Sequence, residues 1–359
     1  MNNIVRYAAI NTKVSAQIGE LLKNEDYINL LSKKNINEVF AYLKQYTHYG
    51  LEFQDIEDIN EGDMHRATLE ILLKKSHVKS LSKSLYFLYD DYREFYKTLF
   101  IRYEIEDLKV ILRGIKTGEF NTAANTNSNL KDTLFYIGMY SDVDANLLIS
   151  SENIQEFVNN LKGTIYYKYL YPLVSGKNLA DINLFTLEMT LDLAYFDIFY
   201  KSIELVDKND RKILEYIQGT NVDLLNLQWI YRGLKFYKLT PEELFNYTIS
   251  HGYVFSRKDI KSLCYSSSLD EYEKRILNTK YSFLFESQNP KNIFMERRIY
   301  RYQYFKLLDI KSRSGLNISK VIVYNLLLEF EVRDIVSVVE SIRYEMPSQE
   351  AKKFLIRKL

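Results

Sequence analysis

Two blocks of sequence recur three times along this chain, each time in the same order. The first block reads EIEDLKVILRG at residues 104–114, DLLNLQWIYRG at 223–233 and EVRDIVSVVES at 331–341. Every copy starts with an acidic residue and has an aspartate or asparagine three positions later, at Asp107, Asn226 and Asp334. Two copies end in Arg-Gly, at Arg113 and Arg232, whereas the third ends in Glu-Ser. Such self-similarity predicts that the chain is built from copies of one structural unit.

The second block combines an aliphatic residue, a glutamate and a Thr-x-Tyr sequence, at residues 32–49, 150–167 and 266–281. In this block Ile154 follows Ile36 by 118 residues and Leu269 follows Ile154 by 115. The copies of the first block begin 119 and 108 residues apart. Two blocks with similar periods indicate three homologous units, each about as long as a typical domain. We predict domains at residues 1–120, 121–237 and 238–359, with the polar stretch 121–129 as a loop between the first two.

The residues within the repeats predict helices. The chain has only 12 glycines and 4 prolines, so long segments run without a residue that breaks a helix. Apolar residues recur at spacings of three and four, as in Ile105, Leu108, Leu112 and Ile115, which would form one helical stripe. The 31 tyrosines weakly favour strands. We give periodicity more weight and predict an all-α fold of three helical domains in tandem.

Composition limits the classes of partner. The chain has 48 basic and 47 acidic residues, for a net charge of +1, which disfavours nucleic-acid binding because there is no global basic field. Cys264 is the only cysteine, so no intramolecular disulfide can form. We expect it to be a small buried thiol in a helix. The amino-terminal sequence does not have the pattern of a signal peptide, and we expect no transmembrane segment.

The sequence lacks the familiar signatures of catalysis and cofactor binding. The motifs GxxxxGK[ST], GxGxxG and GxSxG are absent, and the four histidines have no spacing typical of metal ligands. We expect no catalytic residue, no cofactor and no metal site, and we interpret His48 and His251 as ordinary surface or loop residues. The tyrosine-rich runs resemble RNA-stacking surfaces only superficially, because aromatic stripes at helical spacing usually belong to a core.

Three stretches together resemble a known family. The opening RYAAINTKVSAQIGELLKNEDYINLL, the block SKKNINEVFAYLKQYTHY and the block EIEDLKVILRG look like the C subunit of bacterial and archaeal V-type ATPases. The same family includes the d subunit of the eukaryotic vacuolar ATPase. The resemblance covers essentially the whole chain, although the third copy of the first block lacks the Arg-Gly ending.

The resemblance implies a funnel of three similar helical domains around a pseudo-threefold axis. Such a subunit seats the central rotor shaft on the membrane proteolipid ring, at the cytoplasmic face of the membrane, and transmits torque for proton or sodium transport. It is itself non-catalytic, and one monomeric copy is present in each complex. The resemblance supplies no catalytic residues.

Two interpretations of the repeated polar residues remain open. Arg113, Arg232, Asp107, Asn226 and Asp334 either contact the shaft or stabilise the domains, the arginines by binding carbonyl groups at a helix end. Repetition favours the structural interpretation, because a shaft without threefold symmetry would not make equivalent contacts. The alternative to the coupling function is a helical-repeat scaffold that binds other proteins or RNA.

Overall fold

A computed structural model describes residues 3–54, 64–118, 134, 136–137, 142–237, 239–285 and 293–359. Helices make up 76% of the structure, and these ranges contain no strand, so the all-α prediction is confirmed. The predicted loop at 121–129 lies outside the described residues. The chain forms two compact units, of which unit 1 comprises Met1–Phe87 and Lys208–Leu359, and unit 2 comprises Leu88–Asp207.

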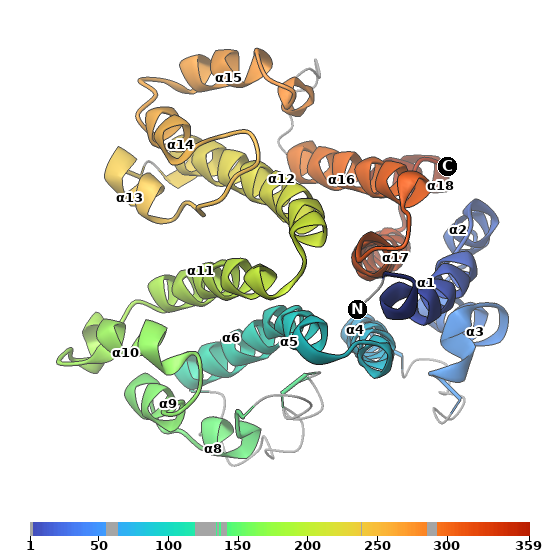
Figure 1. The fold of residues 1–359 in the computed structure, drawn as a ribbon, viewed down its shortest axis with the longest axis horizontal. Helices are drawn as coiled ribbons and strands as arrows, with labels where there is room; N and C mark the ends of the chain where they lie inside the picture. Colours follow the sequence, from blue (N-terminus) through green and yellow to red (C-terminus); the bar gives the residue numbers. More distant parts are fainter. Residues whose placement is uncertain are drawn as a thin grey trace. The chain divides into compact units, whose positions relative to one another are not determined.

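Unit 2 is built around two long helices, α6 and α11, that pack side by side (Figure 1). In the part of the chain that the structure describes, the short helices α8, α9 and α10 come after α6, and α9 contacts it. The helices and short helical turns of unit 2 are α5 (Asp90–Thr98), α6 (Ile101–Thr117), α8 (Ala145–Ile149), α9 (Ile154–Asn160), α10 (Tyr167–Val174), η4 (Leu179–Asp181), α11 (Leu184–Ser202) and η5 (Ile203–Leu205).

The predicted apolar stripe forms the buried face of α6. Ile105 and Leu108 join Phe157 of α9 and Leu187 of α11 in one core cluster. Burial of apolar area on one face of each helix is the main force that holds such helices together. Helix α6 ends at Gly118, whose φ of +74° lies in the left-handed region that glycine adopts readily.

Unit 1 is organised around α17 and α12, each of 25 residues. Helix α17 packs against α1, α4 and α16 and also contacts α2 and α3 (Figure 1). The helices and short helical turns of unit 1 are α1 (Asn3–Glu20), α2 (Asn24–Leu31), α3 (Ile36–Tyr46), η1 (His48–Leu51), α4 (Arg66–Ser84), η2 (Leu85–Phe87), α12 (Lys208–Arg232), η6 (Gly233–Tyr237), α13 (Pro241–Asn246), α14 (Arg257–Cys264), α15 (Leu269–Leu277), η7 (Ser282–Leu284), α16 (Ile293–Arg313), α17 (Ser319–Arg343), α18 (Ser348–Ala351) and η8 (Lys352–Phe354).

Unit 1 contains two core clusters that follow the repeats. In the first, Leu227 of α12 packs with Leu263 of α14 and Ile276 of α15. In the second, Leu43 of α3 packs with Ile335 of α17, so residues from the two ends of the chain share a core. The division into three domains at residues 1–120, 121–237 and 238–359 stays a prediction.

The repeated glutamate of the second block begins a short helix in every copy. The residue before each helix accepts a hydrogen bond from the backbone N–H of that glutamate, at distances of 2.9, 2.9 and 3.2 Å. The glutamate carboxylates accept in return from the backbone N–H groups of Lys34, Glu152 and Ser267. The first bond satisfies an amide that the first helical turn leaves unpaired, and the second ties the residue before the cap to the helix, so the glutamate fixes the helix start in every copy. The capped helices are α3, α9 and α15, with caps Asn35, Asn153 and Ser268.

The Thr-x-Tyr sequence forms the same turn at the end of each of these helices. The threonine hydroxyl donates to a carbonyl oxygen of the preceding helix at 2.6, 2.7 and 2.8 Å. It also accepts from the backbone N–H of the tyrosine at 3.3, 3.3 and 3.1 Å. The turn therefore directs each tyrosine side chain into the core. The three turns are at Thr47, Thr164 and Thr279, and the tyrosines are Tyr49, Tyr166 and Tyr281.

Candidate functional site

The first acidic residue of the first block is buried in all three copies and binds the tyrosine of a second-block copy. The hydroxyl of Tyr166 donates to Glu104, that of Tyr281 to Asp223 at 2.8 Å, and that of Tyr49 to Glu331 at 3.1 Å. The acids are at most 2% exposed and the tyrosines are 0% exposed. A buried carboxylate needs such donors, because leaving it unpaired would cost several kcal/mol. We call these three contacts the acid–tyrosine contacts.

Burial determines the protonation state of the tyrosines. Loss of hydration raises the pKa of Tyr49, Tyr166 and Tyr281, and the adjacent carboxylates raise it further. Each phenol therefore stays protonated and acts as a donor at neutral pH. Burial also raises the pKa of Asp223, although its hydrogen bonds oppose that shift.

Asp223 also fixes the loop before α14. Its carboxylate accepts from the backbone N–H of Val254 at 2.8 Å and of Phe255 at 3.3 Å. The loop passes so close that a Cβ at Gly252 would lie 2.2 Å from the Oδ1 atom of Asp223. Only glycine fits this position without rearrangement, and no pattern in the sequence would have identified it.

The residue three positions after each acid binds backbone groups of a following loop. Asp107 accepts from the backbone N–H groups of Tyr136 at 2.8 Å and Ile137 at 3.0 Å. Asn226 accepts from the N–H of Ile249 and donates to its carbonyl oxygen, both at 2.8 Å. Asp107 and Asn226 are both 0% exposed. Their side chains thus form hydrogen bonds within the protein.

Asp334 makes the corresponding contact in the third copy and is 2% exposed. It accepts from the backbone N–H of Ile356 at 2.6 Å and of Arg357 at 3.4 Å. Arg297 and Arg357 bring guanidinium nitrogens to 3.6 and 3.7 Å from its oxygens. Burial raises the pKa of Asp334 to about 6, while the Ile356 amide and the two arginines oppose the rise.

The two repeated arginines differ in their surroundings. Arg113 binds both carboxylate oxygens of Glu188 on α11, at 2.7 and 2.8 Å, and its side chain is 53% exposed. The structural interpretation predicted that Arg113 binds a carbonyl group at a helix end. Its partner is instead the carboxylate of Glu188. Arg232 lies exposed at the end of α12. Whether either arginine contacts another protein of a complex stays a prediction.

His48 contacts a buried carboxylate, which the sequence did not predict. Its Nε2 atom lies 2.6 Å from the Oε1 atom of Glu331, and its side chain is 18% exposed. The backbone N–H of Leu22 donates to the other oxygen of Glu331 at 2.6 Å. The interpretation of His48 as an ordinary surface or loop residue is therefore wrong, because its side chain contacts a buried carboxylate. Cys264, by contrast, is buried at the end of α14, and burial raises the pKa of its thiol to about 11, as expected of a structural thiol.

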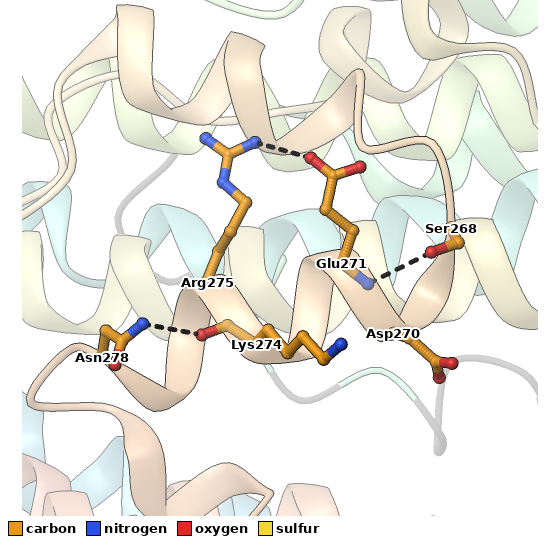
Figure 2. Close-up of a pocket in the computed structure, with 6 residues that line it drawn as sticks. All are labelled: Ser268, Asp270, Glu271, Lys274, Arg275 and Asn278. Carbon is orange, nitrogen blue, oxygen red and sulfur yellow. Dashed lines mark hydrogen bonds and ion pairs between the residues drawn. The ribbon is translucent and has the colours of Figure 1, made fainter.

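The surface depression on α15 has no features of an enclosed ligand site. Several of its polar groups bind one another (Figure 2): Glu271 lies 3.9 Å from Arg275, and Asn278 donates to the carbonyl oxygen of Lys274 at 3.2 Å. All the lining residues come from one helix and its two ends. Within the described residues, no group of three or more histidine, cysteine, aspartate and glutamate side chains could hold a metal ion.

In each copy of the first block, the buried acid binds a tyrosine of the second block and the residue three positions later binds loop backbone, so these six polar residues are used within an all-α fold. The family described as ATP synthase (C/AC39) subunit matches residues 10–354, so the chain belongs to this family. The resemblance to the C subunit of the V-type ATPases is thereby confirmed.

Several archaeal proteins named as the C subunit of an A-type ATP synthase are similar over most of the chain. The relative from Methanosphaera stadtmanae is 24% identical, covering 98% of this chain and 88% of its own. The relative from Methanocaldococcus jannaschii is 22% identical, covering 99% and 87% respectively. The relative from Methanosarcina mazei is 26% identical over 77% of this chain and 71% of its own. No helix in the described part of the chain has the length and apolar character needed to cross a bilayer.

Proposed function

We propose that this chain is a non-catalytic central-stalk subunit of a rotary ATPase of the V/A type. In this role it connects the rotor shaft to the membrane proteolipid ring and transmits torque for proton or sodium transport. It lies at the cytoplasmic face of the membrane as a peripheral subunit, and it takes no cofactor. Three helical domains in a funnel around a pseudo-threefold axis would suit this position between shaft and ring.

The observation that carries the proposal is that the repeated polar residues form hydrogen bonds within the protein. Six buried side chains, two in every copy, bind tyrosines or loop backbone and leave no repeated polar cluster for chemistry within the described residues. They fix the loops to long helices, which favours stiff domains, because buried hydrogen bonds restrict the arrangement of the groups that they join. A protein that transmits torque needs such stiffness. Membership of an ATP synthase subunit family supports the same conclusion.

A comparison of membranes with and without the chain tests the proposal. We expect ATP-driven ion pumping to fail without it, because the shaft would turn without moving the ring. ATP hydrolysis by the detached catalytic head should continue, since the nucleotide sites would lie in other subunits. Re-addition of the purified chain should restore pumping. Loss of hydrolysis in the detached head would contradict a purely coupling role.

A further inference from the structure

Two lysines lie against an aromatic surface of unit 1 that is formed by residues from three segments. The Nζ atom of Lys280 is 4.7 Å from the ring centroid of Tyr253 and 5.0 Å from that of Tyr281. The Nζ atom of Lys306, on α16, is 5.6 Å from the centroid of Tyr302. The ring of Tyr281 is buried, and its centroid lies 6.0 Å from that of Tyr302, so Tyr281 connects the two lysine sites from within the core. We call these five residues the lysine–aromatic patch.

The two ammonium groups give the patch positive charge, which the buried carboxylate of Asp223 offsets in part. Neither ammonium group forms an ion pair with a carboxylate in the described part of the chain. Asp223 binds Tyr281 and two backbone amides, and Asp309 pairs with Arg313 at 2.8 Å. Partial burial lowers the pKa of Lys280, and repulsion from Lys306 lowers it further, against the attraction of Asp223. A bound anion would relieve this repulsion.

The patch occurs in only one of the three copies. The position of Lys280, between threonine and tyrosine, is His48 in the first copy and Ile165 in the second. His48 binds Glu331, and an isoleucine offers no charge. Lys306 lies outside both repeated blocks. A partner without threefold symmetry would bind a feature that is present once, whereas the repeated residues serve all three cores.

We propose that the lysine–aromatic patch binds an acidic, carboxylate-bearing segment of another protein of the central stalk. This inference rests on the proposed function. The ammonium groups supply charge complementarity, which mainly sets association rate and specificity. Tyr253, which is 53% exposed, supplies an amphipathic surface of the kind enriched in protein interfaces.

The test measures binding of the full-length chain to purified shaft proteins of the same complex. The variant K280E/K306E reverses both charges of the patch, and K280R/K306R preserves them. The matched control K258E/K274E reverses two lysines of unit 1 that lie outside the patch. Thermal unfolding confirms that each variant is folded. A parallel assay measures binding to phosphatidylcholine vesicles that contain phosphatidylglycerol.

We expect K280E/K306E to bind the shaft proteins about tenfold more weakly or worse, while the control and the arginine variant bind as the wild type does. The difference should shrink as salt rises well above about 0.1 M, where surface charges are screened. Equal affinity in K280E/K306E and the control would overturn the inference and leave the proposed function standing. Loss of vesicle binding alone would overturn it in favour of a lipid headgroup. If the wild-type chain bound no shaft protein, both proposals would fall.

Discussion

The acid–tyrosine contact of unit 2 and the contact that joins the chain ends in unit 1 use the same chemistry over different sequence separations. Glu104 and Tyr166 are 62 residues apart, whereas Glu331 and Tyr49 are 282 residues apart. In unit 2 the acid helix precedes its tyrosine turn. In the contact between the chain ends, the tyrosine turn comes first, near the amino terminus, and the acid lies in α17 near the carboxyl terminus.

The difference shows that the repeat does not depend on chain order. Tyr49 and Glu331 lie in what the sequence divides into the first and third domains, yet the segments that carry them share one core cluster. His48 adds a contact to Glu331 that Ile165 could not make in unit 2. The contact between the chain ends thus has an extra polar group as well as a longer sequence separation.

The largest expected effect comes from the core. Leu108 in unit 2 and Leu227 in unit 1 are both 0% exposed. Truncation of either to alanine should lower the free energy of unfolding by about 2–5 kcal/mol, because it removes buried apolar contacts and leaves a cavity. Urea unfolding of each variant measures the loss. A change below about 0.5 kcal/mol in one of them would show that the two cores are not equivalent.

The pH dependence of stability should differ between the copies. The pKa of Asp334, about 6, lies above the ordinary value of 3.8. Protonation of Asp334 therefore favours the folded state. The stability that Asp334 contributes is fully present below about pH 4 and is lost as the pH rises through about 6. A shift of this size corresponds to about 3 kcal/mol as an upper bound.

The variant D334N places at this position the residue found at Asn226 and should remove that pH dependence. The difference in free energy of unfolding between wild type and D334N, measured from pH 4 to pH 7, gives the result. A difference that does not change with pH would contradict the raised pKa of Asp334.

The acid–tyrosine contact of unit 2 and the one between the chain ends can be compared directly by removing one hydroxyl from each. Both Y49F and Y166F should lower the free energy of unfolding by about 1 kcal/mol, because a buried acceptor loses one donor. The equilibrium cost depends on the local contact and not on sequence separation. A loss in Y49F several times larger than in Y166F would show that the contact between the chain ends has a special role in holding the chain together.

The smallest effect is expected at the repeated arginines. Arg113 pairs with Glu188 at a half-exposed site, so R113A should cost at most about 1 kcal/mol. R232A serves as the matched control and should change stability less, because Arg232 lies exposed at the end of α12. Thermal unfolding at low and high salt measures both. A loss in R232A equal to that in R113A would argue against a role for the Glu188 pair.

Local features of the fold could be predicted from the sequence. The apolar stripe on α6 follows from helical periodicity, and the repeated residues of the second block form the same caps and turns three times. Long-range partners could not be predicted, because periodicity within a helix does not specify which distant segment it meets. Nothing in the sequence links Arg113 to Glu188, 75 residues away, or His48 to Glu331. The repeated candidates Asp107, Asn226 and Asp334 were identified, but the backbone groups that they bind were not.

The most direct test of the central claim is a pull-down of the tagged chain from gently solubilised native membranes, with co-purifying chains identified by mass spectrometry. The coupling function predicts recovery of the rotor shaft proteins and the ring proteolipid together. Recovery of neither, under conditions that keep the ATPase intact, would contradict that function and favour a helical-repeat scaffold with other partners.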